Sequence, residues 1–170
     1  MISKKLEAAI NAQINKEIYS AYFYLSMAAY CTSIDLDGLA NFYLVQNQEE
    51  TFHAMKLYNF LLDRCGKVNL TKIDGPPVDF KSPLDTFEKT QEHEELVTKS
   101  INDLLDLAIK ESDHATASFL KWYVDEQVEE EATVGKIVNR LKLAGNDVGG
   151  LFIIDTELAA RVYTPPVKGA

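Results

Sequence analysis

Long stretches without glycine or proline constrain the fold of this chain more than any other sequence feature. Neither residue occurs in 1–37, 39–65 or 84–134, whereas five of them occur in 66–83. Each of the three stretches carries apolar residues at the three- and four-residue spacing of an amphipathic helix. The sequence therefore predicts an all-α protein.

Helix-capping signals divide these stretches further. The third stretch is too long for one ordinary helix, and Asp113 provides an N-cap at which a fourth helix can begin. Ser82 followed by Pro83 is typical of the start of the helix before it. The expected helices cover 4–32, 37–64, 84–112 and 114–144, followed after a cluster of glycines by a short fifth helix over 147–161.

The lengths of the connections predict the topology. The first and second helices, and the third and fourth, are joined by tight turns, so each pair forms an antiparallel hairpin. The connection over 65–83 is long enough to run along a bundle whose helices are each about 42 Å long. We therefore expect a single domain over 1–170, a four-helix bundle with one long crossover loop and a short fifth C-terminal helix.

Composition excludes several classes of protein. The 17 Lys and Arg residues against 26 Asp and Glu give a net charge of −9, which favours cations over nucleic acid as partners. The two cysteines, Cys31 and Cys65, form no disulfide framework and suit a reducing compartment. The sequence has no apolar run long enough for a signal peptide or a membrane span. We expect a cytoplasmic protein without membrane partners.

Polar side chains interrupt the apolar stripe near the middle of every long helix. They are Glu17, Glu50, His53, Glu94, Gln127 and Glu130. In an antiparallel hairpin, residues that face each other are equally distant from the turn. The midpoints between Glu17 and the pair Glu50 and His53 fall at 33.5–35, inside the first expected turn. The first hairpin therefore brings its polar residues to the same height.

The second hairpin gives the same result. The midpoints between Glu94 and the pair Gln127 and Glu130 fall at 110.5–112, inside the second expected turn. Both hairpins thus place carboxylates at the centre of the bundle, where each costs several kcal/mol unless neutralised. Two divalent cations neutralise four carboxylates more completely than protons do.

The spacing of Glu50 and His53 specifies the kind of cation. E-x-x-H places a carboxylate and an imidazole one turn apart on the same helix face. One Glu from each of two other helices together with such a motif is typical of di-iron or di-manganese bundles. A site rich in oxygen with a single histidine suits iron or manganese better than zinc or copper.

Four segments at matching spacing identify a resemblance that covers essentially the whole chain. They read INKEIYSAYFYLSMA, QNQEETFHAM, EHEELVTKSI and FLKWYVDEQVEEE. Together they resemble the prokaryotic non-haem ferritins. The resemblance implies an iron-storage ferritin with ferroxidase activity, which oxidises Fe(II) with dioxygen or hydrogen peroxide. It also implies storage of ferric mineral inside a 24-subunit cage.

The same resemblance assigns roles to individual residues. It implies that the first iron is held by Glu17, Glu50 and His53. It implies that the second iron is held by Glu50, Glu94 and Glu130, so that Glu50 bridges the two. These residues form the expected dinuclear ferroxidase centre.

Further residues resemble a third iron site and a redox side chain. Glu49, Glu126 and Glu129, together with Glu130, resemble the third site on the cavity side. Glu126, Glu129 and Glu130 share one flank of a helical wheel, which favours a cation patch over a solvated acidic face. Tyr24 resembles the tyrosine beside the dinuclear centre, and core packing and redox assistance are both open to it.

Two departures separate the chain from neighbouring families. Bacterioferritins and rubrerythrin-like proteins carry a second E-x-x-H on the fourth helix, where this chain has Gln127, near both irons, and no histidine. The haem-ligand methionine of bacterioferritins would follow Glu50, where this chain has Thr51. Neither haem nor a rubredoxin-like iron is expected.

Rival interpretations remain open at this point. One alternative is a structural helical bundle without catalytic activity, whose buried carboxylates are protonated. A second alternative, closer to a ferritin, is a small di-metal oxidase or peroxide scavenger that does not store iron. Trp122 suits packing better than electron donation. His93 and His114 have no carboxylate partner on the inward stripe, and we expect both at the surface.

Overall fold

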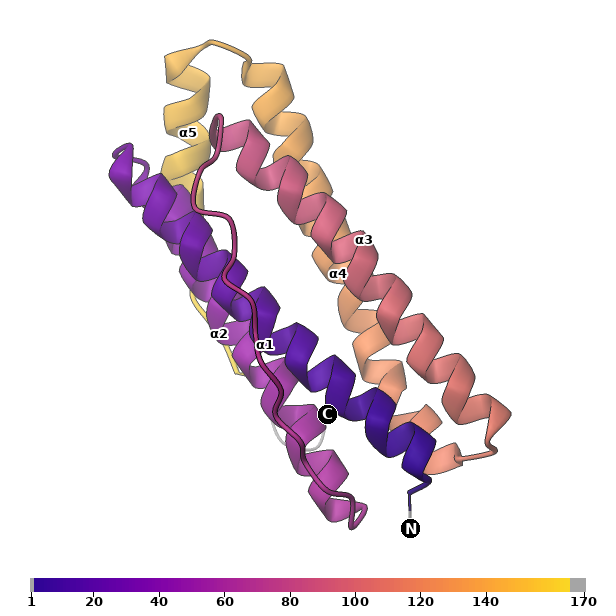
Figure 1. Ribbon diagram of the computed structural model, residues 1–170. Coiled ribbons are helices and arrows are strands. Elements are labelled where there is room, and N and C mark those ends of the chain that lie inside the picture. Colours follow the sequence, from indigo (N-terminus) through magenta and orange to yellow (C-terminus); the bar gives the residue numbers. More distant parts are fainter. Residues whose placement is uncertain (1, 166–170) are drawn as a thin grey trace.

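Five helices make up the described part of the chain, residues 2–165, in a computed structural model of the protein (Figure 1). No strand occurs within these residues. The helices are α1 (Lys4–Ser33), α2 (Asp37–Asp63), α3 (Pro83–Lys110), α4 (His114–Ala144) and α5 (Val148–Leu158). The predicted all-α class is confirmed, and the bounds of the four long helices lie within two residues of the expected ones.

Local capping explains where these helices begin. The Ser82 side chain accepts a hydrogen bond from the backbone N–H of Asp85, and Pro83 occupies the first helical position of α3. Asp113 likewise accepts from the backbone N–H of Thr116 at the start of α4. The sequence signals at these two boundaries therefore act as predicted.

The crossover connection follows the length of the bundle (Figure 1). Residues 64–82 leave the end of α2 and return along α1 to the opposite end, where α3 begins. Hydrogen bonds tie the crossover to α1: the backbone N–H of Lys67 donates to Glu7, and Ser26 donates to the carbonyl of Pro77. As a result, α2 and α3 run in the same direction, and the predicted crossover topology is confirmed.

Two apolar clusters separated by a polar layer form the core. One contains Tyr24, Phe42 and Phe87 and lies toward α5. The other contains Ile14 and Leu57 among its members and lies toward the opposite end. The buried polar residues predicted from the stripes lie in the layer between these clusters. Close packing on both sides holds that layer in place.

The short helix α5 docks onto the start of α2. The Asp155 side chain accepts a hydrogen bond of 2.8 Å from the backbone N–H of Leu39. A Cβ at Gly38 would lie 1.7 Å from the carbonyl oxygen of Asp155, so only glycine permits this approach. The helix ends at Leu158, three residues before the expected bound of 147–161, because the following chain is held by Asn41, which donates to the carbonyls of Leu158 and Arg161.

Among the described residues, no helix combines the length and apolar character that a membrane span requires.

Candidate metal centre

The polar layer of the bundle contains one or two chemically active residues from each long helix. All of them are buried, with exposed fractions of 1–7%. They are Glu17 on α1, Glu50 and His53 on α2, Glu94 on α3, and Gln127 and Glu130 on α4. Sequence analysis predicted this set, and the structure places its members at the same height.

A first group of metal-ligating atoms joins the first hairpin. One oxygen each of Glu17 and Glu50 and one ring nitrogen of His53 lie within 4.8 Å of one another. The Nδ1 atom of His53 is 3.4 Å from Oε2 of Glu50, as expected for residues one helical turn apart. Burial lowers the pKa of His53 to about 4, so the imidazole is neutral and can ligate a metal at neutral pH.

A second group joins the two hairpins. Carboxylate oxygens of Glu50, Glu94 and Glu130 also lie within 4.8 Å of one another. Glu50 belongs to both groups, and it is the only described residue that the first and second groups share. Two cations bound at these groups would therefore be bridged by the Glu50 carboxylate.

The electrostatics of the layer favour cations. Burial raises the pKa of Glu17, and it raises those of Glu50 and Glu130 well above the usual range. For Glu50 the charges of Glu94 and Glu17 add to this effect. Burial raises the pKa of Glu94 to about 7. Without a positive charge the four carboxylates resist ionisation, and metal ions would remove that penalty.

Two carboxylate oxygens in the layer lack a hydrogen-bond partner. Among residues 2–165 they are Oε2 of Glu17 and Oε2 of Glu50, both of which are inaccessible to solvent. Buried polar atoms in folded proteins are normally paired. The two glutamates of the first group therefore each have an oxygen that can ligate a cation.

Three buried glutamines support the carboxylates, and each donates its amide N–H to one of them. The pairs are Gln13 with Glu17 at 2.8 Å, Gln46 with Glu130 at 2.6 Å and Gln127 with Glu94 at 3.1 Å. Sequence analysis gave no role to Gln13 or Gln46. A usable signal existed, since Gln13 precedes Glu17, and Gln46 precedes Glu50, by four residues on the same stripe.

Aromatic side chains enclose the layer. The Tyr24 hydroxyl donates a hydrogen bond to Oε1 of Glu94, and burial raises the pKa of Tyr24 well above its usual range. Trp122 packs edge-on against His53 with ring centroids 5.3 Å apart, and the Nζ atom of Lys56 lies 3.8 Å from the Trp122 ring centroid. Tyr24 therefore contacts the layer through a hydrogen bond to Glu94, and Trp122 contacts it by packing against His53.

His93 is half-buried, where its position off the inward stripe predicted a surface residue, and it lines the outer pocket between α1, α3 and the crossover. Burial lowers its pKa to about 4, and its Nε2 atom lies 2.7 Å from the Ser20 hydroxyl. The ring packs against Tyr19 and Phe23 of α1, since bulky aromatic side chains at this helix crossing cover it. His114, in contrast, is exposed as expected.

The residues expected to form a third site line a separate small cavity of about 110 Å³. Thr133 also lines it, together with the four glutamates Glu49, Glu126, Glu129 and Glu130 and with Arg161. Sequence analysis did not predict the arginine, whose Nη2 donates a hydrogen bond of 2.7 Å to Glu49. Atoms of Glu126 and Glu130 also lie within 4.8 Å of His53 and of each other, which places this cavity next to the polar layer.

Comparison with known proteins identifies relatives along the whole chain. The sequence matches the ferritin-like domain family over residues 7–144. It is 44% identical to the bacterial non-heme ferritin of Staphylococcus epidermidis over 163 residues, which cover 96% of this chain and 98% of that protein. The bacterial non-heme ferritin of Staphylococcus aureus is 40% identical over the same shares of both chains.

Solved structures show the same likeness. An open-pore ferritin from the hyperthermophilic archaeon Archaeoglobus fulgidus is 51% identical, with a TM-score of 0.95, and the match covers 95% of this chain and 100% of that one. A humanized archaeal ferritin is 50% identical, with a TM-score of 0.96, and the match covers 97% of this chain and 100% of that one. This chain is therefore similar to these ferritins in both sequence and fold over nearly its whole length.

Proposed function

The chain belongs to the ferritin family, and on that premise we propose that it stores iron and oxidises Fe(II) at the polar layer of its bundle. One observation carries this proposal: two groups of ligand atoms, each within 4.8 Å, share Glu50. Such an arrangement holds two ferrous ions side by side. Each ion gives up one electron, so the pair can together reduce one molecule of dioxygen or hydrogen peroxide by two electrons.

The two metal positions differ in their donors. The first has the neutral imidazole of His53 beside Glu17 and Glu50, whereas the second depends on carboxylates alone. Gln127 occupies the place of a second histidine, and its Nε2 donates to Oε2 of Glu94 at 3.1 Å. This contact supports a hydrogen-bonding role for the amide, so the second iron is the more weakly held one.

Weak binding of the second iron suits a centre through which iron passes. Glu130 belongs to the second group and also lines the cavity of Glu49, Glu126 and Glu129. A ferric ion released from the second position can therefore move to these carboxylates without crossing an apolar region. In this account iron is the substrate and cargo of the centre, and it is not a permanent cofactor.

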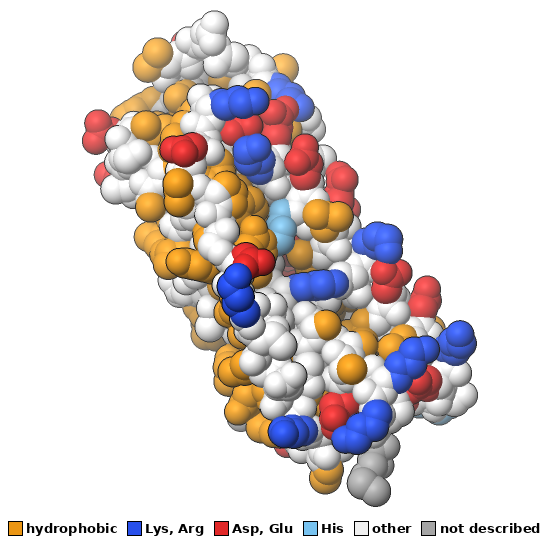
Figure 2. Space-filling model, viewed as in Figure 1, with side chains coloured by type: hydrophobic (Ala, Val, Ile, Leu, Met, Phe, Trp, Pro, Cys, Tyr) orange, Lys and Arg blue, Asp and Glu red, His pale blue; other side chains and the backbone are white. Residues whose placement is uncertain are grey.

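Exposed apolar side chains support assembly with further copies of this chain, and we propose the 24-subunit cage on the resemblance to the family. Of the residues of α5, only Ile154 is buried within the described chain, while Val148, Phe152 and Ile153 are more than half exposed. Apolar side chains also gather over α1 and the crossover on the face shown in Figure 2. Patches of this kind usually mark protein interfaces. Contacts of α5 around a four-fold axis would cover its apolar side.

Aerobic addition of Fe(II) tests storage, with ferric absorbance and particle mass recorded on the same sample. We expect absorbance to grow well beyond two irons per chain and the iron to co-elute with a particle of about 24 chains. A small oxidase would oxidise Fe(II) but leave the product outside the particle. A silent scaffold would do neither, and either result would contradict the storage function.

A further inference from the structure

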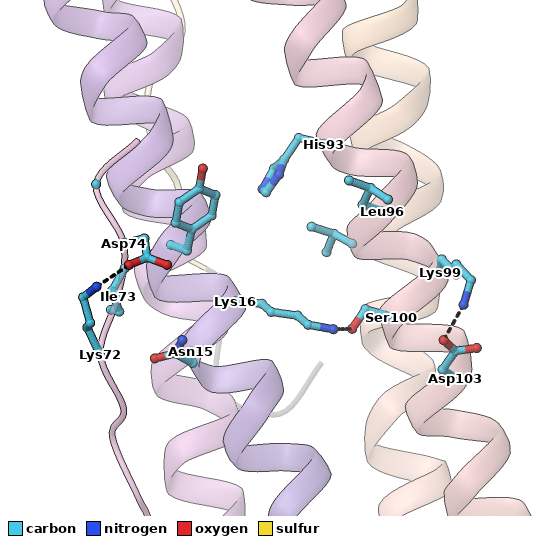
Figure 3. A pocket seen from close by; sticks show the side chains of 13 residues that line it. Asn15, Lys16, Lys72, Ile73, Asp74, His93, Leu96, Lys99, Ser100 and Asp103 are labelled. Carbon is cyan, nitrogen blue, oxygen red and sulfur yellow. Dashed lines mark hydrogen bonds and ion pairs between the residues drawn. The ribbon is translucent and has the colours of Figure 1, made fainter. Parts of the chain in front are cut away.

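A chain of three hydrogen bonds leads from an outer pocket of the bundle to Glu17. The pocket, of about 650 Å³, lies between α1, α3 and the crossover, and the Lys16 side chain crosses it to reach Ser100 (Figure 3). The Nζ atom of Lys16 donates to the Ser100 hydroxyl at 2.5 Å. Ser100 donates to Oε1 of Gln13 at 2.5 Å, and Nε2 of Gln13 donates to Oε1 of Glu17 at 2.8 Å.

The charge on Lys16 fixes the direction of the whole chain. An ammonium group has three N–H donors and no acceptor. The Ser100 oxygen therefore accepts from Lys16, and its single hydrogen is directed to the carbonyl end of the Gln13 amide. The NH₂ end of Gln13 is thereby turned toward Glu17. With the opposite orientation, an amide oxygen would face the carboxylate and repel it.

This direction decides which carboxylate oxygen of Glu17 is engaged. Oε1 accepts from Gln13, while Oε2 has no hydrogen-bond partner among residues 2–165. Gln13 is only 1% exposed, so solvent water does not compete for its hydrogen bond to Glu17. One oxygen of Glu17 is thus held by the protein, and the other is left for a cation.

We propose that Gln13 positions Glu17 for the first metal, and that Lys16 and Ser100 act as further positioning residues by orienting the Gln13 amide. This proposal rests on the dinuclear centre proposed above and adds the residues that organise it from the outer side. Removing a group that orients a metal ligand commonly lowers metal affinity by roughly 10- to 100-fold. The effect should fall on the first position, because Glu17 belongs to the first group only.

Calorimetric titration of the metal-free protein with Zn²⁺, a redox-silent probe, tests the proposal. The first metal position is identified as the equivalent of bound Zn²⁺ that is lost in His53→Ala. Gln13→Leu should weaken that equivalent roughly 10- to 100-fold and leave the second unchanged. Lys16→Met and Ser100→Ala should also weaken zinc binding at the first position, but by a smaller factor. Lys16→Arg keeps a side chain that can only donate hydrogen bonds, so it should retain wild-type affinity.

Lys99→Met is the matched control, since Lys99 lines the same pocket but pairs with Asp103. Wild-type zinc affinity in Gln13→Leu, or equal effects of Lys16→Met and Lys99→Met, would overturn the positioning role even if melting temperatures changed. Absence of the two zinc equivalents in the wild type would instead show that the dinuclear centre itself is wrong, and the positioning role with it.

Arg161, which follows α5, is held at the third-site cavity by contacts with α2. Asn41 donates to the carbonyls of Leu158 and Arg161 at 3.0 and 2.9 Å and thereby fixes the chain against α2. The guanidinium lies 4.5 Å from the Phe42 ring centroid, and its Nη2 is 2.7 Å from Oε2 of Glu49. Arginine keeps its charge at any pH that the protein tolerates. The third-site cavity therefore contains a permanent positive charge supplied by the protein.

We infer that Arg161 is a counter-ion that iron must displace from Glu49 to occupy the third site. This inference rests on the proposed third site. The guanidinium of Arg161 already holds Oε2 of Glu49 at 2.7 Å before any metal arrives. The same contact competes with a cation for Glu49. Arg161 thereby limits the occupancy of the third site to conditions in which iron is abundant.

Zinc titration of Arg161→Gln tests this competition. The third equivalent should tighten roughly fivefold, or appear where the wild type shows none, since a partly exposed ion pair is worth up to about 1 kcal/mol. Arg161→Lys should stay close to wild type, and Arg140→Gln, which removes a surface pair with Glu157, is the control. An unchanged or weaker third equivalent would overturn the role of Arg161, whereas no third equivalent in either protein would exclude the third site as well.

Discussion

Replacing His53 with alanine is expected to abolish the fast phase of Fe(II) oxidation. The imidazole is the only nitrogen donor of the first group, and burial keeps it neutral by lowering its pKa to about 4. Glu50→Ala should be at least as severe, because Glu50 belongs to both groups. We expect initial rates to fall by at least about 100-fold, since even residues that only orient a ligand are worth 10- to 100-fold.

Stopped-flow absorbance after mixing with aerobic Fe(II) measures this effect, with size-exclusion chromatography as a check on assembly. His114→Ala is the matched control, because His114 is exposed and lies outside the layer. The variant and control should assemble alike and differ only in rate. An unchanged initial rate in His53→Ala would show that oxidation takes place elsewhere.

Replacing Glu94 with glutamine is expected to stabilise the metal-free protein increasingly as pH rises. The pKa of Glu94 is raised from 4.5 to about 7 by burial, so between these values the native state retains a proton that the unfolded chain has released. The contribution of protonated Glu94 to the free energy of unfolding of the wild type is therefore fully present below pH 4.5 and is lost as the pH rises through 7. The loss amounts to roughly 3 kcal/mol, since a tenfold change in proton affinity corresponds to about 1.4 kcal/mol.

The difference between variant and wild type is the informative quantity. Burial lowers the pKa of both His53 and His93 to about 4, so these residues add stability as pH rises to 6.5 and oppose the carboxylates. Both proteins contain them, and subtraction removes their contribution. Urea unfolding of the metal-free proteins between pH 4.5 and 8 should show the difference growing to a plateau above pH 7.

With zinc bound, the wild type should become more stable than Glu94→Gln. A bound cation stabilises the ionised carboxylate in the wild type and binds the variant less tightly. A difference in stability that does not vary with pH would mean that Glu94 is ionised throughout. Buried negative charge would then give no reason for cations to bind in the polar layer.

Much of the fold could be predicted because its determinants are local. Capping residues such as Ser82 and Asp113 mark where helices begin, and the turns fix the register of each hairpin, so Glu17 and Glu50 could be paired from sequence alone. Glu94 and Glu130 followed by the same reasoning. Charged residues on an apolar helix face are easily recognised in a sequence, so the residues of the polar layer could be predicted without the structure.

The features that escaped prediction depend on tertiary contacts. Gln13 is uncharged and did not stand out on its stripe, although its amide engages Glu17. Arg161 lies beyond the last helix, and only its contacts with Asn41 and Glu49 bring it to the acidic cavity. His93 lay off the inward stripe, and aromatic side chains of α1 cover one part of its ring.

The number of Fe(II) ions oxidised per chain in the fast phase tests the central claim most directly. Increasing amounts of Fe(II) are mixed aerobically with the metal-free wild type, and the amplitude of the first absorbance phase is recorded. Two groups joined through Glu50 predict that this amplitude rises linearly and stops at two Fe(II) per chain. An amplitude that saturates at one Fe(II) per chain, or that rises without a break, would contradict a dinuclear centre.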